Sequence, residues 1–169
     1  KLGKKQKFVV SPQGFRSRYT DKETIEIFTM VMAGKMNKNI VLALEKQGIN
    51  AVGLSGLDGF LLKALRKKRL IIIDKRSKKK VIDGGYTGKI IDINTDLLQT
   101  ILEKNYTPVI TPIAISEEFE PLNVDGDRTA SAVASILNAD KLILMTDVDG
   151  LILNKKLVTK IKISELKAL

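Results

Sequence analysis

Two short clusters of polar and acidic residues stand out because each lies where a buried segment ends. The first is Asn123, Asp125 and Asp127, directly before a helix-like run of small residues over 128–137. The second, residues 146–150, reads Thr-Asp-Val-Asp-Gly and follows an apolar run. An ionised carboxylate is costly to bury unpaired, so such residues seldom serve packing alone. Because open α/β sheets bind ligands where strands end, the two clusters predict one shared binding edge.

The same residues also have an ordinary structural interpretation. Asp or Asn before a helix usually caps it, and the residues alone favour capping at Asn123, Asp125 and Asp127. The Thr146-Asp147 pair could equally be a plain turn at the end of a strand.

The composition limits which chemistry is available. The 169 residues are 44% apolar and contain neither Cys nor His. This excludes Ser-His-Asp and Cys-His nucleophiles, His-ligated or thiolate metal sites and a disulfide framework. No apolar run reaches the ~20 residues that span a bilayer, and no signal-peptide pattern is present. We therefore expect a cytoplasmic protein without a membrane partner. Heavy use of Lys and Ile is typical of thermophiles, although an AT-rich genome would have the same effect.

The net charge of +10 is concentrated in two segments. Residues 63–80 hold ten cations and one acid, and residues 1–18 hold six cations and no acid. The longer run could be a solvated hairpin, a nucleic-acid surface or a surface for an acidic protein. No aromatic residue lies between Phe60 and Tyr86, so base stacking lacks support and nucleic acid is the weaker reading.

Hydrophobic periodicity and turn residues predict alternating strands and helices. Thr20 and Glu23 have capping-box spacing, and Gly34 is expected to interrupt the helix that follows. We predict strands over 7–11, 51–54, 70–74, 80–82, 89–93, 109–115 and 141–145, and helices from 20, over 37–47, 94–104 and 128–137, and from near 164. This order predicts an α/β fold, a mainly parallel sheet covered on both faces with one inserted antiparallel hairpin.

Five blocks of the sequence, taken in order, resemble the amino acid kinase family. They are residues 14–21, 32–38, 53–59, 123–127 and 146–150. The chain is most similar to the acetylglutamate kinases, and among these to the branch that phosphorylates aminoadipate or glutamate carried on the acidic carrier protein LysW. Three features favour that branch: the pair Arg16 and Arg18, the dipeptide Asp125-Gly126, and Tyr86 with Lys89.

The resemblance implies a three-layer αβα sandwich of the carbamate kinase-like type and an ATP- and Mg²⁺-dependent reaction that forms an acyl phosphate in lysine or arginine biosynthesis. It also implies a homodimer built on the helix over 24–36. A carboxylate acceptor is ionised at neutral pH, so the absence of histidine is no obstacle to this reaction.

The resemblance also assigns roles to individual residues. Arg18, with Arg16 beside it, would hold the substrate's α-carboxylate, Asn123 would orient the substrate, and Asp127 would organise the catalytic lysines. The residues implied for ATP are Thr146, Asp147, Gly150, Leu151 and Ile152, and those for the carrier protein are Lys67, Lys68, Arg69, Tyr86 and Lys89. No metal site made of protein side chains is implied.

Two alternatives remain open at this point: an N-acetylglutamate kinase of arginine biosynthesis, and a basic nucleic-acid-binding module. The family's first phosphate loop and second catalytic lysine have no counterpart in the chain. The resemblance therefore implies one family domain over 1–169, truncated at both ends, and we expect the chain as given to lack phosphoryl transfer.

Overall fold

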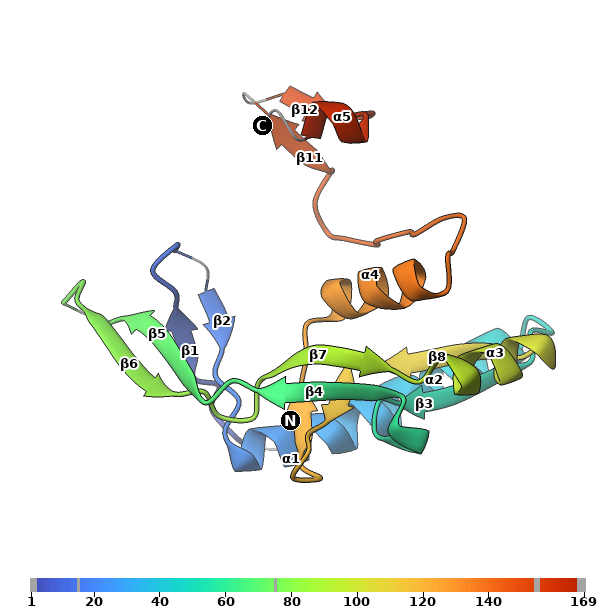
Figure 1. The fold of residues 1–169 in the computed structure, drawn as a ribbon, viewed down its shortest axis with the longest axis horizontal. Coiled ribbons are helices and arrows are strands. Elements are labelled where there is room, and N and C mark those ends of the chain that lie inside the picture. The colour runs from blue at the N-terminus through green and yellow to red at the C-terminus, as the bar shows by residue number, and fades with distance from the viewer. Residues whose placement is uncertain (1–2, 15, 75, 154–155, 167–169) are drawn as a thin grey trace. The chain divides into compact units, whose positions relative to one another are not determined.

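The computed structural model describes residues 3–14, 16–74, 76–153 and 156–166. The chain forms two compact units, Lys1–Ala139 and Asp140–Leu169 (Figure 1). Within its described residues, the first unit contains the strands β1 (Phe8–Val10), β2 (Arg16–Arg18), β3 (Ala51–Ser55), β4 (Leu62–Arg66), β5 (Arg69–Ile73), β6 (Lys79–Asp83), β7 (Gly88–Ile93), β8 (Thr107–Thr111), β9 (Ile113–Ile115) and β10 (Pro121–Asn123). The second unit contains β11 (Leu151–Leu153) and β12 (Lys156–Val158).

The helices of the first unit include one continuous helical stretch made of three parts. These are α1 (Lys22–Thr29), the π-helical turn η1 (Met30–Met36) and α2 (Asn37–Glu45). The others are the short η2 (Asp58–Phe60), α3 (Thr95–Glu103) and α4 (Gly126–Ile136), and the second unit contains α5 (Ile163–Leu166).

Parallel pairing joins β3 to β8 and β4 to β9. The larger sheet has the strand order β10-β9-β4-β7, and its other pairs are antiparallel, as are β1–β2, β5–β6 and β11–β12. Among the described residues, more strand pairs are therefore antiparallel than parallel. Several of these pairs join strands that follow each other along the chain, and the turns between them are too short for the crossover that a parallel pair needs.

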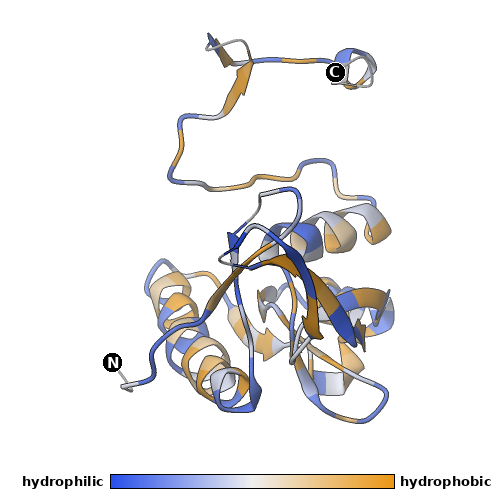
Figure 2. Cartoon of the chain, turned by 90° about the vertical axis from the view of Figure 1, so that its left-hand side faces the viewer, coloured by the Kyte–Doolittle hydropathy of each residue, from blue (hydrophilic) through white to orange (hydrophobic). Residues whose placement is uncertain are grey.

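The core of the first unit lies between the larger sheet and the helices. Its buried members come mainly from β4, β9, β10 and α3, and they are Leu61, Leu62, Ala64, Ile93, Leu98, Ala114, Leu122 and Val124. Helix α4 covers β7 through Ala132 and its neighbours, while α2 contacts β3 and β8. Figure 2 shows apolar stripes on these helices, which is the pattern that burial of one helix face requires.

The α/β fold class is confirmed, and so are several local predictions. Strands β5 and β6 form the inserted antiparallel hairpin, with Leu70 opposite Ile82. Asn94 caps α3, and its side chain accepts a hydrogen bond from the backbone N–H of Leu97 at 3.1 Å.

Three predicted boundaries are wrong. Asp21, and not Thr20, caps α1, because the Asp21 carboxylate accepts from the Thr24 N–H at 2.9 Å. Gly34 does not interrupt the helix, which widens into π geometry and continues. The strand predicted over 109–115 is divided into β8 and β9 at Pro112, which has no N–H for strand pairing.

The strand predicted over 141–145 is also wrong. Among the described residues no strand forms there, and the side chains of Ile143 and Met145 are 73% and 95% exposed. The segment is apolar, as Figure 2 shows by its colour. A strand needs a neighbour for its backbone N–H and C=O groups, and no described residue pairs with this segment.

Candidate functional site

Strand β2 presents two arginines, Arg16 and Arg18, on one face, because alternate residues of a strand point the same way. The Arg16 guanidinium lies over the Phe8 ring, 4.0 Å from its centroid, in a cation–π contact. The Arg18 side chain makes no hydrogen bond or ion pair within the described part of the chain. Neither arginine has an ion pair among the described residues, but the Arg16 head group already packs on a ring, so Arg18 has the head group that is freer to bind an anion.

Arg18 also lines a cavity of about 560 Å³ in the first unit. One wall is apolar and comes from α1 and η1, including Phe28 and Val31, and the polar side includes Tyr19 and Lys4. Burial raises the pKa of the Tyr19 phenol, so the phenol stays protonated and able to donate at neutral pH. The cavity thus combines a cation and a hydroxyl with an apolar surface.

Asn123 ends β10 and is tied to the segment that carries Arg18. Its side-chain Nδ2 donates to the Thr20 hydroxyl at 3.0 Å, and its backbone N–H donates to the Tyr86 carbonyl at 2.8 Å. The Tyr86 N–H in turn donates to the Thr20 carbonyl at 2.7 Å. Thr20 is 1% exposed and lies two residues after Arg18, so the structure brings the Arg18 and Asn123 segments together.

Sequence reasoning missed Thr20 as a partner of Asn123. It assigned the Thr20 hydroxyl to the helix cap, where Asp21 serves instead. The sequence did contain a signal for this contact. Thr20 and Asp21 are both good capping residues, and because only one of them caps the helix, the other side chain is free for another contact.

Asp125 and Asp127 have different surroundings at the start of α4. The Asp125 carboxylate accepts from the Arg128 N–H at 2.9 Å and caps the helix, in agreement with its structural interpretation. Asp127 lies in the first turn and is exposed, and no described residue bonds to its carboxylate. Its carboxylate remains available, and it stands four residues after Asn123.

Residues 146–152 lie in the second unit. The Thr146 hydroxyl accepts from the Val148 N–H at 3.4 Å, Gly150 adopts φ +135°, and Leu151 and Ile152 begin β11. Asp147 is exposed. The segment offers a hydroxyl, a carboxylate and exposed apolar side chains close together. Such a set suits the sugar and base of a nucleotide, and it provides no cation for phosphates.

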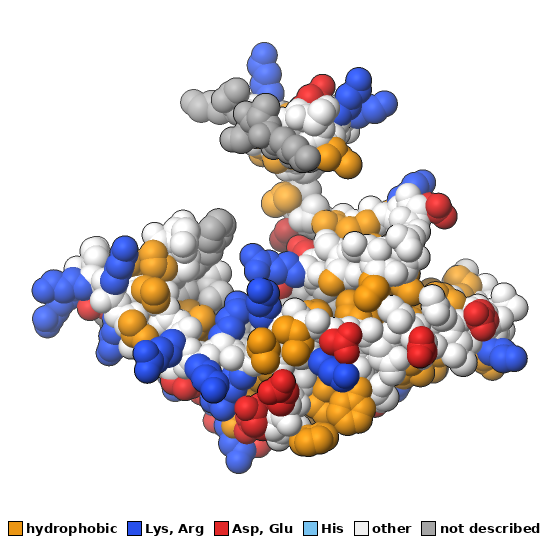
Figure 3. Space-filling model, viewed as in Figure 1, with side chains coloured by type: hydrophobic (Ala, Val, Ile, Leu, Met, Phe, Trp, Pro, Cys, Tyr) orange, Lys and Arg blue, Asp and Glu red, His pale blue; other side chains and the backbone are white. Residues whose placement is uncertain are grey.

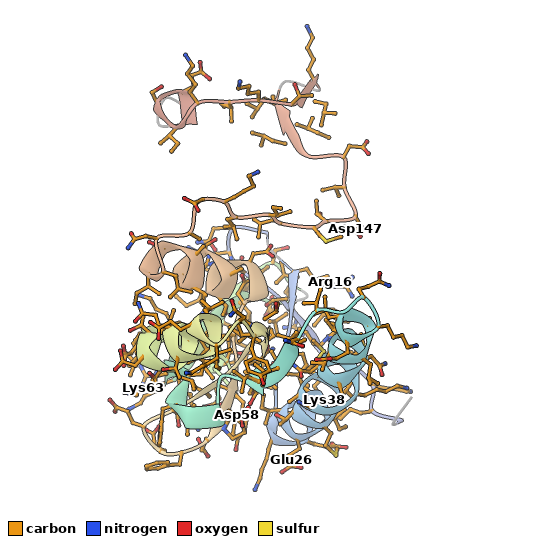
Figure 4. All side chains as sticks on the ribbon, turned by 90° about the vertical axis from the view of Figure 1, so that its right-hand side faces the viewer. Arg16, Glu26, Lys38, Asp58, Lys63 and Asp147 are labelled. Atoms are coloured by element: carbon orange, nitrogen blue, oxygen red, sulfur yellow. The ribbon has the colours of Figure 1, made fainter. Side chains whose placement is uncertain are left out.

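The β5–β6 hairpin carries the basic surface of the first unit (Figure 3). Lys67 and Lys68 lead into it, and their backbones bond to Thr87 and Gly84 at 2.9 and 3.2 Å. Arg69 pairs in register with Asp83, and Lys89 lies on β7 opposite Leu65. Figure 4 shows the labelled Lys63, at the start of the basic run, apart from Arg16, whereas β1 of the N-terminal basic segment contacts β5 of the hairpin.

Arg66, which sequence reasoning did not single out, holds the base of this hairpin. Its guanidinium lies 5.0 Å from the centroid of the Tyr86 ring, and its Nε donates to the Gly85 carbonyl at 2.8 Å. It also pairs with Asp83 and Glu120 at 3.5 and 3.4 Å. Within a run of ten cations, the sequence offered no signal to distinguish this one.

Lys4 bonds to the Asp21 carboxylate at 2.7 Å, and this bond predicts a pH dependence of stability. The bonds from Lys4 and Thr24 lower the pKa of Asp21 below its ordinary value. Because the pKa of Asp21 is lower in the folded state, its stabilising effect is fully present above the pKa of an Asp in the unfolded chain, about 4, and is lost as pH falls.

We expect Asp21→Asn, which keeps the cap, to lower the urea midpoint at pH 7. The difference from the unmodified protein should shrink below about pH 4, and an equal difference at pH 7 and pH 2.5 would contradict the ion-pair assignment.

Neither a metal cluster nor a membrane helix is found in the described ranges. There, no three His, Cys, Asp or Glu side chains are grouped to hold a metal ion. Of the helices formed by the described residues, none has the length and apolarity needed to cross a bilayer.

The sequence profile described as "Amino acid kinase family" matches residues 1–169. A relative in Nitrosopumilus maritimus is 55% identical over 166 residues, covering 98% of this chain and 62% of the relative. A protein of Metallosphaera sedula named LysW-aminoadipate/LysW-glutamate kinase is 47% identical over 170 residues, covering all of this chain and 64% of that protein. The chain thus spans less than two thirds of the length of these relatives.

Two solved structures share the fold. The protein smu.665 of Streptococcus mutans matches with a TM-score of 0.72 at 28% identity, over 89% of this chain and 57% of that one. N-acetylglutamate synthase of Neisseria gonorrhoeae, in complex with coenzyme A and N-acetylglutamate, matches with a TM-score of 0.73 at 22% identity, over 99% of this chain and 35% of that one.

Proposed function

The chain belongs to the amino acid kinase family, and we propose that the natural full-length protein is an ATP-dependent kinase of carboxylates presented by an acidic carrier protein. The acceptor would be the side-chain carboxylate of aminoadipate or glutamate linked to LysW, and the product an acyl phosphate. The observation that carries the proposal is the 47% identity, over the whole of this chain, to a relative named for this substrate pair.

The arrangement of Arg18 and Asn123 supports an acceptor site in the first unit. Arg18 is unneutralised within the described residues and lines a cavity, so its planar guanidinium could bind the α-carboxylate in a bidentate way. The Asn123 amide is oriented by its bond to Thr20, which leaves its Oδ1 and second N–H for the substrate. Arg16 would add positive charge beside this site, although its head group also packs on Phe8.

The reaction needs no general base. The acceptor carboxylate is ionised at neutral pH, and one of its oxygens forms a bond to the γ-phosphorus of ATP as the bond to the ADP oxygen breaks. The protein must therefore position the two substrates and neutralise charge. We assign to Asp127 the role of accepting hydrogen bonds from the lysines that do so, since its carboxylate is exposed and unpaired among the described residues.

ATP is assigned to residues 146–152 of the second unit. The Asp147 carboxylate and Thr146 hydroxyl suit the ribose hydroxyls, and Leu151 and Ile152 suit the base. Mg²⁺ would be bound through the phosphates, which are its ordinary ligands in kinases. ATP supplies the phosphoryl group.

We also propose that the protein is a homodimer that associates through α1, η1 and α2. Met30, Met36 and Ile40 on this helical stretch are 60%, 44% and 48% exposed, an apolar exposure typical of contact surfaces. Sedimentation of the full-length protein at micromolar concentration should give twice the monomer mass.

A transfer assay tests the proposed function. The full-length protein is given ATP with LysW-linked aminoadipate, LysW-linked glutamate or free N-acetylglutamate, and acyl phosphate is trapped with hydroxylamine. We expect the carrier-linked acids to be preferred. Preference for the free acid would make the protein an acetylglutamate kinase, and transfer to none of them would contradict a kinase.

The basic hairpin is proposed as part of the carrier surface. Lys67 and Lys68 lead into β5, and Arg69, Tyr86 and Lys89 belong to the same region. We expect Lys67→Glu/Lys68→Glu to raise KM for the carrier-linked acceptor roughly 10-fold at low salt, because opposite charges speed encounter. The KM for ATP should not change. Added salt should reduce the difference from the unmodified protein; a difference independent of salt would contradict electrostatic docking.

A further inference from the structure

Asn37 occupies an unusual place for a polar side chain. It is the first residue of α2, directly after the π-helical turn η1, and it is 3% exposed. Its side chain faces the parallel pair β3–β8, which α2 contacts. The sequence resemblance included residues 32–38 and 53–59, and the proposed function gives neither block a role.

A single amide group of Asn37 bonds to both strands of this pair. Its Nδ2 donates to the Leu54 carbonyl on β3 at 3.2 Å, and on β8 to the Val109 carbonyl at 2.7 Å and the Thr111 hydroxyl at 3.1 Å. Leu54 and Thr111 lie near the carboxyl ends of their strands. Asn37 therefore fixes these two strand ends against each other and against the helix.

This arrangement has a cost that an apolar residue would avoid. The Asn37 Oδ1 is buried and has no partner among the described residues, and an unsatisfied buried oxygen is destabilising. Position 53 must also remain glycine, because an added Cβ would overlap the Asn37 Oδ1. A leucine at position 37 would fill similar volume without a buried unsatisfied oxygen, but it would make none of these bonds to the strand ends.

The β8 end leads directly to the proposed acceptor site. Thr111 precedes Pro112, whose carbonyl accepts from the Val124 N–H at 3.3 Å. The next residue, Ile113, pairs in register with Asn123. A shift of the β8 end would therefore move the backbone of Asn123 and, through Val124, the start of α4.

We infer that Asn37 is a positioning residue for the acceptor site. It holds the ends of β3 and β8 so that the Asn123 amide lies where the substrate needs it. Gly53 provides the room for its side chain. The neighbouring Lys38, labelled in Figure 4, donates to the Gly53 carbonyl at 3.0 Å, a bond that reaches β3 but not β8 and so takes no part in this positioning. This inference rests on the proposed function.

Steady-state kinetics of the full-length protein test this role. Asn37→Leu should raise KM for the carboxylate acceptor about 10-fold, while KM for ATP stays within about twofold, because a small displacement weakens one set of contacts. Thr111→Val is the milder variant, since it removes one of the three acceptors of the Asn37 amide and a long bond of 3.5 Å from the Thr111 hydroxyl to the Met32 carbonyl, at a site that is 4% exposed. Roughly a threefold rise in the acceptor KM is expected. If Asn37→Leu does not fold, the acceptor KM of Thr111→Val tests the inference by itself.

A purely structural role would give a different result. Loss of folded protein lowers the apparent kcat and leaves both KM values unchanged. Lys38→Met is the matched control, because it removes a bond from the same helix to β3 but touches no bond to β8, and its acceptor KM should match the unmodified protein. Equal KM values in all variants, or equal rises for both substrates, would overturn the inference alone. Absence of transfer by the unmodified protein would contradict the proposed function and overturn the inference with it.

Discussion

Replacing Asp127 by asparagine is expected to lower kcat of the full-length protein by at least about 100-fold, the size of effect seen when one preorganised electrostatic contact is lost. The substitution keeps the shape of the side chain and removes its charge. If Asp127 holds the catalytic lysines, as we propose, an amide could orient them only weakly. The KM values for both substrates should change little, because the loss falls on the transition state.

The fold should tolerate this change. The Asp127 carboxylate is exposed and bonds to no described residue. Its expected contribution to stability is that of an acid in the first turn of a helix, about 0.3–1 kcal/mol. Circular dichroism and a urea titration should therefore show a folded protein.

Asp125→Asn is the matched control, because it removes the same charge two residues away. Asparagine caps a helix as well as aspartate does, so the bond to the Arg128 N–H can be kept. We expect kcat of this variant to remain within about threefold of the unmodified value. Similar losses at positions 125 and 127 would mean that only the net charge at the start of α4 matters, and the organising role of Asp127 would be wrong.

Arg18→Ala is expected to raise KM for the acceptor between about 10-fold and 150-fold, the equivalent of one hydrogen-bonded charged contact. The physical reason is that the guanidinium has no partner among the described residues, so its binding capacity is available to a carboxylate. KM for ATP should stay unchanged. For the same reason the fold should lose little, since no described ion pair is broken.

Arg18→Lys and Arg16→Ala sharpen this test. Lysine keeps the charge but not the planar fork, so its KM should fall between those of the unmodified protein and the alanine variant. Arg16 already packs on the Phe8 ring, and its removal should raise the acceptor KM less than removal of Arg18 does. A larger effect at Arg16 would reverse the roles of the two arginines.

Elements decided by neighbouring residues were predictable from the sequence. The hairpin of β5 and β6, the Asn94 cap of α3 and the capping role of Asp125 were all expected, and the structure has them. Their hydrogen bonds join residues that are close in sequence, so the residue types alone favour them. The position of Asn123 and Asp127 near the start of a helix was predictable for the same reason, whereas β2, which carries Arg18, was not predicted.

Contacts between distant segments were decided only by the tertiary structure. The bond from Asn123 to Thr20 spans 103 residues, and the one from Asn37 to Thr111 spans 74. Both capping choices near residue 20 looked acceptable locally, and packing against β10 selected Asp21 for the cap. Similarly, the apolar residues 141–145 match a strand pattern, but a strand forms only where another strand accepts its hydrogen bonds.

The sequence by itself therefore determined the α/β class and the family, and it supplied the polar residues that we propose bind a carboxylate. The tertiary structure decided that the Arg18 and Asn123 segments meet through Thr20, and that Asn37 holds the strand ends beside them. The physical reason is that helix caps and hairpins depend on a few adjacent residues. The geometry of a binding site depends instead on buried hydrogen bonds that exist only after distant segments have packed together.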